Sequence, residues 1–248
     1  MIADRFAPDA QDVLGDEHRV DDDLVIWRYA AIERFLDVLF GHVGLSRADV
    51  QDDRAEGAVG WRKLTIAPEA WERLGGGDGD VRDFIERARR RSYLSCWHAR
   101  EHESEAMWFH YGGGGTKVAF VTTVGKMRAL VPSPTYGKVL YASAVERPIR
   151  APQELFFLKR TPFADEREVR FVLMTARDEH EPFAEFPCTA GAFLDAVYFA
   201  PSVPAEDART YVRVAHAICA QQGGRFAVPV WRSALSGDVF EDEDLRLN

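Results

Sequence analysis

The chain has 248 residues, of which 46% are hydrophobic and 29% charged, and its formal net charge at pH 7 is −9. These values are typical of a water-soluble protein with one sizeable core. The negative charge argues against general nucleic-acid binding, because phosphate backbones bind basic surfaces. No run approaches the roughly 18 apolar residues of a membrane span, and the first residues lack the apolar core of a signal peptide. We therefore expect a cytoplasmic protein without a membrane partner.

The first third of the chain alternates between strand-like and helical patterns. Residues 1–23 are acidic and contain Pro and Gly, which predicts a loose arm. The run LVIWRYA from Leu24 predicts a buried strand, and GLSRADVQDD predicts a short strand with a loop. Three helices are expected between and after these strands. Their signals are an apolar stripe at Ile32, Phe35, Leu36 and Leu39, a helix-opening Pro68, and an N-cap at Asp80.

The rest of the chain continues the alternation. A strand in SYLSCW is followed by a helix in SEAMWFHY, and four consecutive Gly at 112–115 end that helix. A helix is also expected in QELFFLKR, another in PAEDARTYVRVAHAICAQQ, and a short helical turn in AGAFLD. Further strands are expected in KVAFVTT, GKVLYAS, EREVRFVLMT, EPFAEFP, AVYFAP and FAVPVWRS.

This order predicts a mixed α/β (α+β) fold with a central, largely antiparallel or mixed sheet flanked by helices. No internal repeat or Pro/Ser-rich linker divides the chain. We expect one globular domain over residues 24–236, preceded by the acidic arm 1–23 and followed by an acidic tail over residues 237–248.

The segment KRTPFADEREVRFVLM carries the strongest candidates for catalysis. If it forms one strand, Glu166, Glu168 and Arg170 point to the same side, and the basic residues Lys159 and Arg160 lie nearby. Such side chains can form simple ion pairs at the rim of a sheet. They can also perform acid–base chemistry or stabilise an oxocarbenium ion, with Glu168 as the first choice for the catalytic group.

A second set of candidates lies between Tyr93 and Tyr111. Trp97 and His98 sit where a strand gives way to a polar loop, which is a common place for a binding site. Trp108 and Tyr111 share a helical face and are interpreted either as core residues or as ring-stacking groups. The Cys and His spacings match no metal site, so no metal is predicted.

Several motifs resemble a bacterial family called domain of unknown function 2971. They are WRYAAIERFLDVL, SRADVQDDRAEG, YLSCWHAREHESEAMWFHY, KVAFVTTVGKM, YGKVLYAS, FFLKRTPFADEREVRF and AVYFAPSVP, and they extend from Trp27 to the last strand. One departure is DDRAEG, where similar sequences more often have Asp-Pro-Phe-Glu-Gly. The resemblance implies a fold and assigns no activity.

The order of three short motifs also resembles arginine-type ADP-ribosyltransferases. Arg28 stands on an early strand, Thr122 and Thr123 on a middle strand, and Glu166 with Glu168 near a late strand. The resemblance implies that NAD is a substrate, that Arg28 binds its pyrophosphate, that Trp97 or Tyr111 stacks on a flat ring, and that Glu168 stabilises the ribosyl cation. The middle triplet departs from the Ser-Thr-Ser of that family.

Three functions remain open at this point. The first is an NAD-using ADP-ribosyltransferase-like or glycohydrolase enzyme in bacterial defence or stress response. The second is a nuclease or toxin in which His98, Glu103 and Glu168, with Lys159 and Arg160, handle a phosphodiester. The third is a non-catalytic sensor that holds a small nucleotide ligand in an aromatic cleft.

Overall fold

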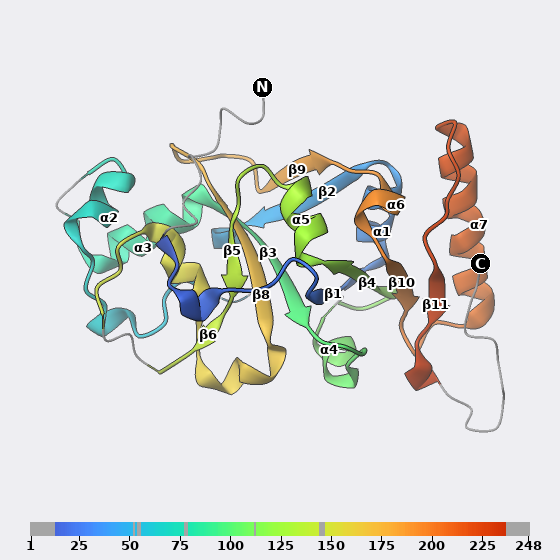
Figure 1. The fold of residues 1–248 in the computed structure, drawn as a ribbon, viewed down its shortest axis with the longest axis horizontal. Coiled ribbons are helices and arrows are strands. Elements are labelled where there is room, and N and C mark those ends of the chain that lie inside the picture. Colours follow the sequence, from blue (N-terminus) through green and yellow to red (C-terminus); the bar gives the residue numbers. More distant parts are fainter. Residues whose placement is uncertain are drawn as a thin grey trace. The chain divides into compact units, whose positions relative to one another are not determined.

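The computed structural model describes residues 13–51, 53, 56–76, 79–111, 113–143 and 147–236. The predicted acidic tail lies outside these residues, as does the first half of the predicted acidic arm. The fold is mixed α/β, with nine strands in a large mixed, mainly antiparallel sheet and helices flanking it, so the predicted fold class is confirmed (Figure 1). Within the described residues, no helix is both long and apolar enough to cross a membrane.

Contacts divide the chain into two compact units, and each unit is assembled from three stretches of sequence. The first unit comprises residues 1–21, 44–97 and 131–185, and the second comprises residues 22–43, 98–130 and 186–248. The chain crosses between the units repeatedly, so they are not successive domains. The single-domain bounds 24–236 remain a prediction.

In its described residues, the first unit is built from two α-helices, several 3₁₀ helices and a group of strands. Its elements are most of β2 (His42–Arg47), α2 (Pro68–Arg73), α3 (Val81–Arg91), most of β3 (Ser92–Ala99), β5 (Thr135–Lys138), β6 (Leu140–Tyr141), β7 (Leu158–Lys159), β8 (Glu168–Met174) and the first part of β9 (Phe183–Pro187). The strand β8 pairs with both β3 and β5, and β5 lies antiparallel to it (Figure 1). All seven residues of β8 are buried, so this strand is covered on both faces.

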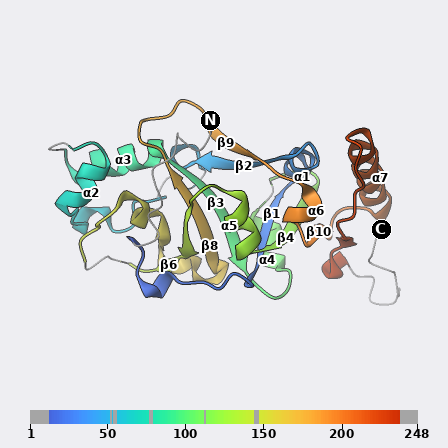
Figure 2. The ribbon, with the colours of Figure 1, turned by 45° about the horizontal axis from the view of Figure 1, so that its top comes forward.

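The helix α3 shows how local sequence fixes an element of the first unit. Asp80 is its N-cap, and the carboxylate accepts the backbone N–H groups of Arg82 at 2.8 Å and Asp83 at 3.0 Å, as predicted. Further along the helix, Phe84 and Ile85 are buried in the core. There the ring of Phe84 meets Trp71 of α2, with 4.9 Å between ring centroids. The two helices accordingly lie side by side (Figure 2).

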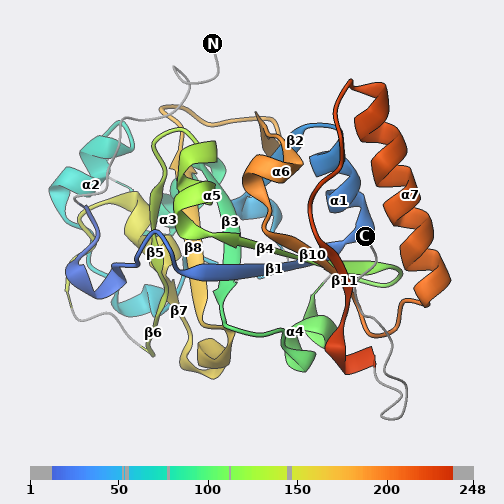
Figure 3. The same cartoon turned by 45° about the vertical axis from the view of Figure 1, so that its right-hand side comes forward.

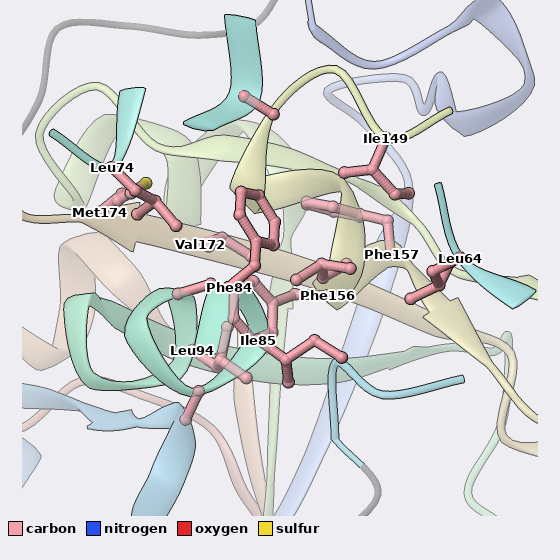
Figure 4. Close-up of a cluster of buried hydrophobic side chains, with 14 residues drawn as sticks. Leu64, Leu74, Phe84, Ile85, Leu94, Ile149, Phe156, Phe157, Val172 and Met174 are labelled. Atoms are coloured by element: carbon pink, nitrogen blue, oxygen red, sulfur yellow. The ribbon is translucent and has the colours of Figure 1, made fainter. Parts of the chain in front are cut away.

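A hydrophobic cluster fills the centre of the first unit. Figure 4 shows side chains from α3, β3 and β8, together with Leu74 at the end of α2, converging on the 3₁₀ turn Pro152–Phe157. The cluster consists of Ala48, Leu64, Ala70, Leu74, Phe84, Ile85, Ala88, Leu94, Ile149, Leu155, Phe156, Phe157, Val172 and Met174. His18 of the predicted loose arm is also buried in this unit, where its ring meets Phe157 edge-on and its Nδ1 lies 2.8 Å from the Lys138 carbonyl oxygen.

The second unit is built around a run of paired strands. Its elements are β1 (Val25–Ala31), α1 (Ile32–Leu39), the end of β3, α4 (Glu105–His110), β4 (Lys117–Thr123), α5 (Val124–Leu130), α6 (Ala190–Phe193), β10 (Ala196–Phe199), α7 (Ala205–Gln221) and β11 (Val230–Arg232). The strand β4 pairs antiparallel with β1 and β10, and β11 joins β10 in parallel (Figure 3). Phe35 of α1 packs on Phe120 and Phe199, which closes one face of this sheet.

Three details differ from the sequence-based expectations. The helix α5 was not predicted, because VGKMRAL is short and its two buried apolar residues, Val124 and Met127, give only a weak periodic signal. The expected strand GKVLYAS is divided between the end of β5 and β6. The expected helix in QELFFLKR is a 3₁₀ turn over Pro152–Phe157, all of whose residues are buried, and it leads directly into β7.

Candidate functional site

A cluster of ion pairs in the first unit joins five charged side chains that are far apart in the sequence. Its members are Glu56, Lys159, Glu166, Glu168 and Arg170. Arg170, on β8, has a side chain only 1% exposed. Its guanidinium binds both carboxylate oxygens of Glu56, with Nη2 donating to Oε2 at 3.0 Å, and its Nε donates to Glu168. It also donates to the Phe156 carbonyl oxygen at 2.6 Å. The burial of this cation is therefore compensated by two carboxylates and one carbonyl group.

Lys159 connects the inner and outer parts of this ion cluster. Its ammonium group donates to Oε1 of Glu168 at 2.8 Å and also to Oε2 of Glu166. The Glu166 side chain is 13% exposed and that of Glu168 is 2% exposed. The Lys159 ammonium additionally lies 4.8 Å from the ring centre of Phe163. One cation thus holds a buried and a partly exposed carboxylate together.

The expected strand placement of Glu166 is wrong. Residues Thr161–Glu166 form a 3₁₀ turn, and Arg167 then adopts a left-handed conformation with φ 48° and ψ 49°. The strand β8 begins only at Glu168, so Glu166 cannot share its face through strand periodicity. The turn instead brings the two carboxylates together at Lys159.

The two glutamates that share Lys159 have pKa values displaced in opposite directions. Burial raises the pKa of Glu166, a hydrogen bond with Glu168 raises it further, and the contact with Lys159 opposes the rise. Burial alone would also raise the pKa of Glu168, but the charges of Arg170 and Lys159 outweigh it and lower the pKa well below its usual range. Adjacent carboxyl groups with divergent pKa values are a common arrangement for acid–base chemistry.

Charge balance in the cluster is consistent with the raised pKa of Glu166, whose largest cause is burial. The cluster contains three carboxylates, Glu56, Glu166 and Glu168, and two cations, Lys159 and Arg170, so one negative charge is in excess. Glu166 has the most exposed of the three carboxylates, at 13% against 6% for Glu56 and 2% for Glu168. It is therefore the one that can meet solvent or a substrate and exchange a proton with it.

Neighbouring groups that could compete for protons are held neutral. The hydroxyl oxygen of Tyr141 accepts the backbone N–H of Glu168 at 2.8 Å, and burial raises the pKa of Tyr141 to about 12. Burial also raises the pKa of the Cys96 thiol to about 12, the charge of Arg170 acting against it. A neutral buried thiol is a poor nucleophile.

Three of the predicted cofactor-binding residues have roles inside the protein. Trp97 is fully buried in the first unit, and its indole N–H donates to the Ser95 hydroxyl at 2.9 Å. In the second unit the buried Thr122 hydroxyl donates to the Phe193 carbonyl oxygen, while the Thr123 hydroxyl accepts the Lys126 N–H at 3.4 Å near the start of α5. Neither face of the Trp97 ring is open for stacking in this conformation.

The other four predicted cofactor-binding residues, which are Arg28, His98, Trp108 and Tyr111, lie in the second unit. The ring of His98 lies 5.9 Å from that of Tyr29 and 5.0 Å from that of Tyr111, and Trp108 meets Tyr29 edge-on at 4.8 Å. The Trp108 indole N–H donates to Glu103 at 2.8 Å. Arg28 is half-buried on β1, opposite Phe120 of β4.

The structure thus unites Glu166, Glu168 and Arg170 in one cluster. Arg28, His98, Trp108, Tyr111, Thr122 and Thr123 belong to the second unit. Their predicted binding roles remain predictions. Sequence reasoning did not identify Glu56 as a partner of Arg170, 114 residues away. The only signal was its place in the quoted motif DDRAEG, since neither periodicity nor spacing predicts so distant a pair.

The described part of the chain contains no group of three or more His, Cys, Asp or Glu side chains arranged to hold a metal ion.

Comparisons with known proteins give a distant similarity. No protein-family model and no curated protein matches the chain. The resemblance to domain of unknown function 2971 therefore remains a prediction. Among solved structures, the chain is similar to DarT of Thermus sp. 2.9 in complex with ADP-ribosylated ssDNA, with 13% identity and a TM-score of 0.40 over 88% of this chain and 98% of that one. The same protein in complex with carba-NAD+ gives 12% identity and a TM-score of 0.40 over the same shares. A similarity this distant assigns no catalytic or binding role to any residue of this chain.

Proposed function

We propose that the ion cluster of Glu56, Lys159, Glu166, Glu168 and Arg170 is the active centre of an NAD-consuming enzyme, an ADP-ribosyltransferase-like or NAD-glycohydrolase activity. The observation that carries the proposal is the pairing of Glu166 and Glu168 on one Lys159 ammonium, with the pKa of Glu166 raised and that of Glu168 lowered. Glu166 is the catalytic residue in this proposal. Glu168 and Arg170 are positioning residues, because their side chains are almost fully buried.

The chemistry requires a group that takes a proton while a positively charged sugar develops. When the bond between C1′ of the ribose and the nicotinamide nitrogen breaks, its electron pair stays on the nicotinamide nitrogen. A water or acceptor group forms the new bond to C1′, and its proton passes to Glu166. The Glu166 carboxylate also faces the developing oxocarbenium ion, where negative charge lowers the barrier.

The surroundings of Glu166 suit a diphosphate-bearing substrate. Arg160 and Arg167 flank the 3₁₀ turn that carries Glu166, and both side chains are exposed. Arg160 also lies 5.1 Å from the ring centre of Phe163. Guanidinium groups bind phosphates through paired hydrogen bonds, so these two residues are the proposed contacts for the pyrophosphate of NAD.

The test is nicotinamide release from NAD by purified protein, alone and with cell extract, followed by chromatography. Wild type should release nicotinamide, and Glu166→Gln should lower the rate by roughly 100-fold or more while keeping the same unfolding curve. Glu185→Gln, which changes an exposed carboxylate on β9 of the same unit, should match wild type.

Two outcomes would overturn the proposal. One is the absence of release together with the absence of a thermal shift on adding NAD. The other is release by Glu166→Gln at the wild-type rate. Binding of NAD without any release would favour the sensor function over the enzyme.

A further inference from the structure

A separate cavity in the first unit has the features of a binding site. Its volume is about 440 Å³, within the range of small-molecule sites. It is lined by Val13, Leu14, Gly15, Glu17, Glu69, Arg73, Arg147 and Arg150. None of these residues belongs to the ion cluster around Lys159.

The backbone around this cavity is held by contacts between distant segments. Ile66 and Ile149 form a parallel bridge, in which the Ile149 N–H donates to the Thr65 carbonyl at 2.8 Å and the Ala67 N–H donates to the Ile149 carbonyl at 2.8 Å. This bridge fixes the segment carrying Arg147 and Arg150 beside the start of α2. The helix α2 then places Glu69 in its first turn and Arg73 in its last.

A buried carboxylate orients the arginine segment. Glu154 is 2% exposed and accepts the backbone N–H groups of Arg150 and Ala151, each at 2.9 Å. It also accepts a hydrogen bond from the guanidinium of Arg147, whose other end lies 3.8 Å from Glu17. Arg147 is therefore positioned in the cavity wall by charges on two sides. Such support from buried groups is typical of a preorganised site.

Two cations of the wall remain available for a ligand. Among the described residues, neither Arg73 nor Arg150 has an ion-pair partner for its side chain, and both side chains are exposed. Two unpaired guanidinium groups beside a third cation attract a dianionic group such as a phosphate. The carboxylates of Glu17 and Glu69 on the same wall accept hydrogen bonds from hydroxyl groups.

We propose that this cavity binds a small phosphorylated sugar, with Arg73 and Arg150 holding the phosphate and Glu17 and Glu69 accepting its hydroxyl groups. The described lining has Val13 and Leu14 as its large apolar side chains and no aromatic ring for a base to stack on. A sugar phosphate therefore fits this wall better than a nucleotide does. The inference is independent of the proposed NAD chemistry, because it concerns a different set of residues and is tested by binding.

The experiment is calorimetric titration of the full chain with ribose 5-phosphate, with ribose and inorganic phosphate titrated separately. Ribose 5-phosphate should bind at least tenfold more tightly than either component. Arg73→Ala and Arg150→Ala should each weaken that binding by roughly tenfold or more. Arg82→Ala, which removes an exposed cation of α3 from the same unit, should leave it unchanged.

The inference fails if ribose 5-phosphate does not bind wild type, or if the arginine variants bind as wild type does. Equal affinity for inorganic phosphate and ribose 5-phosphate would overturn the assignment of a sugar ligand. Glu69→Gln provides an independent check, because it should weaken ribose 5-phosphate binding and leave inorganic phosphate binding unchanged. Adding AMP tests the nucleotide alternative, since tighter binding of AMP would overturn the preference for a sugar phosphate.

Discussion

Glu166 and Glu168 bind the same ammonium group of Lys159, although only Glu168 lies on strand β8. The inner carboxylate of Glu168 has a second cation in Arg170, whereas the outer carboxylate of Glu166 forms its ion pair with Lys159. This asymmetry gives two chemically identical side chains different protonation behaviour. It also makes their contributions to folding separable by mutation.

Replacing the outer carboxylate should have little effect on folding at neutral pH. Glu166→Gln removes the excess negative charge of the ion cluster and keeps an oxygen that accepts from Lys159. We expect the free energy of unfolding to change by less than about 1 kcal/mol at pH 7. Urea unfolding monitored by circular dichroism measures this, and a loss of several kcal/mol would contradict it.

The pH dependence of that variant has a defined sign. Folding raises the pKa of Glu166, so the folded state binds a proton more readily than the unfolded state. The contribution of Glu166 to stability is therefore full below the unfolded pKa and is lost as pH rises through the folded pKa. Across this window, wild type should lose stability relative to Glu166→Gln. Unfolding curves at a series of pH values from about 4 to 7 would show it.

Replacing the inner carboxylate should be far more damaging. Glu168→Gln leaves Arg170 and Lys159 with one fewer anion in a buried setting, and we expect a loss of about 3–5 kcal/mol. The folded-state pKa of Glu168 is lowered, so its stabilisation is present above the unfolded pKa and is lost as pH falls through the folded one. Acid should therefore destabilise wild type more steeply than this variant. Equal losses in the two glutamate variants would contradict the different roles assigned here.

Sequence patterns predicted most helices and strands because their signals are local. The Asp80 cap and the Phe84 and Ile85 face lie within one helix, and the apolar run of β1 lies within one strand. The candidate site could be predicted from the sequence only in part. Glu168 and Arg170 share one strand, so periodicity placed them together, but Arg167 interrupts the expected strand and no pattern signals its left-handed backbone. Glu56 reaches Arg170 through tertiary contacts alone.

The N-cap prediction can be tested by itself. Asp80→Ala removes the acceptor for the N–H groups of Arg82 and Asp83, and we expect a loss of about 1 kcal/mol. Glu86→Ala removes an exposed contact with Arg82 on the same helix and should cost less than about 0.5 kcal/mol. Denaturant unfolding of both variants gives the comparison. Equal effects would contradict a capping role for Asp80.

The backbone of Arg167 predicts a difference between two substitutions. Its φ of 48° is a conformation that glycine adopts readily and β-branched residues avoid. Arg167→Gly should leave stability unchanged or raise it by up to about 1 kcal/mol, whereas Arg167→Val should lower it by more than about 1 kcal/mol. Thermal unfolding of the pair tests this. A Val variant as stable as the Gly variant would argue against the left-handed turn that brings Glu166 to Lys159.

The shared ammonium group predicts energetic coupling between Lys159 and Glu166. Lys159→Met leaves the two carboxylates next to each other without their common cation, and we expect a loss of about 3–5 kcal/mol. Burial by itself would lower the pKa of Lys159, but the charge of Glu168 and the hydrogen bonds of both glutamates raise it. The Lys159 contribution is therefore present below the unfolded pKa and is lost as pH rises through the folded pKa.

A double-mutant cycle isolates this coupling. In the Lys159→Met background, Glu166→Gln removes the outer of the two neighbouring carboxylates that have lost their common cation, so it should recover roughly 1 kcal/mol or more of the lost stability. In wild type the same substitution should change little, because the Lys159 ammonium lies between Glu166 and Glu168 and screens the repulsion between them. Lys126→Met serves as the control and should show no coupling with Glu166→Gln. The ion pair of Lys126 with Asp195 is exposed and lies in the second unit. Strict additivity of Lys159→Met and Glu166→Gln would mean that the two side chains do not interact in solution, and the acid–base role of Glu166 would lose its structural basis.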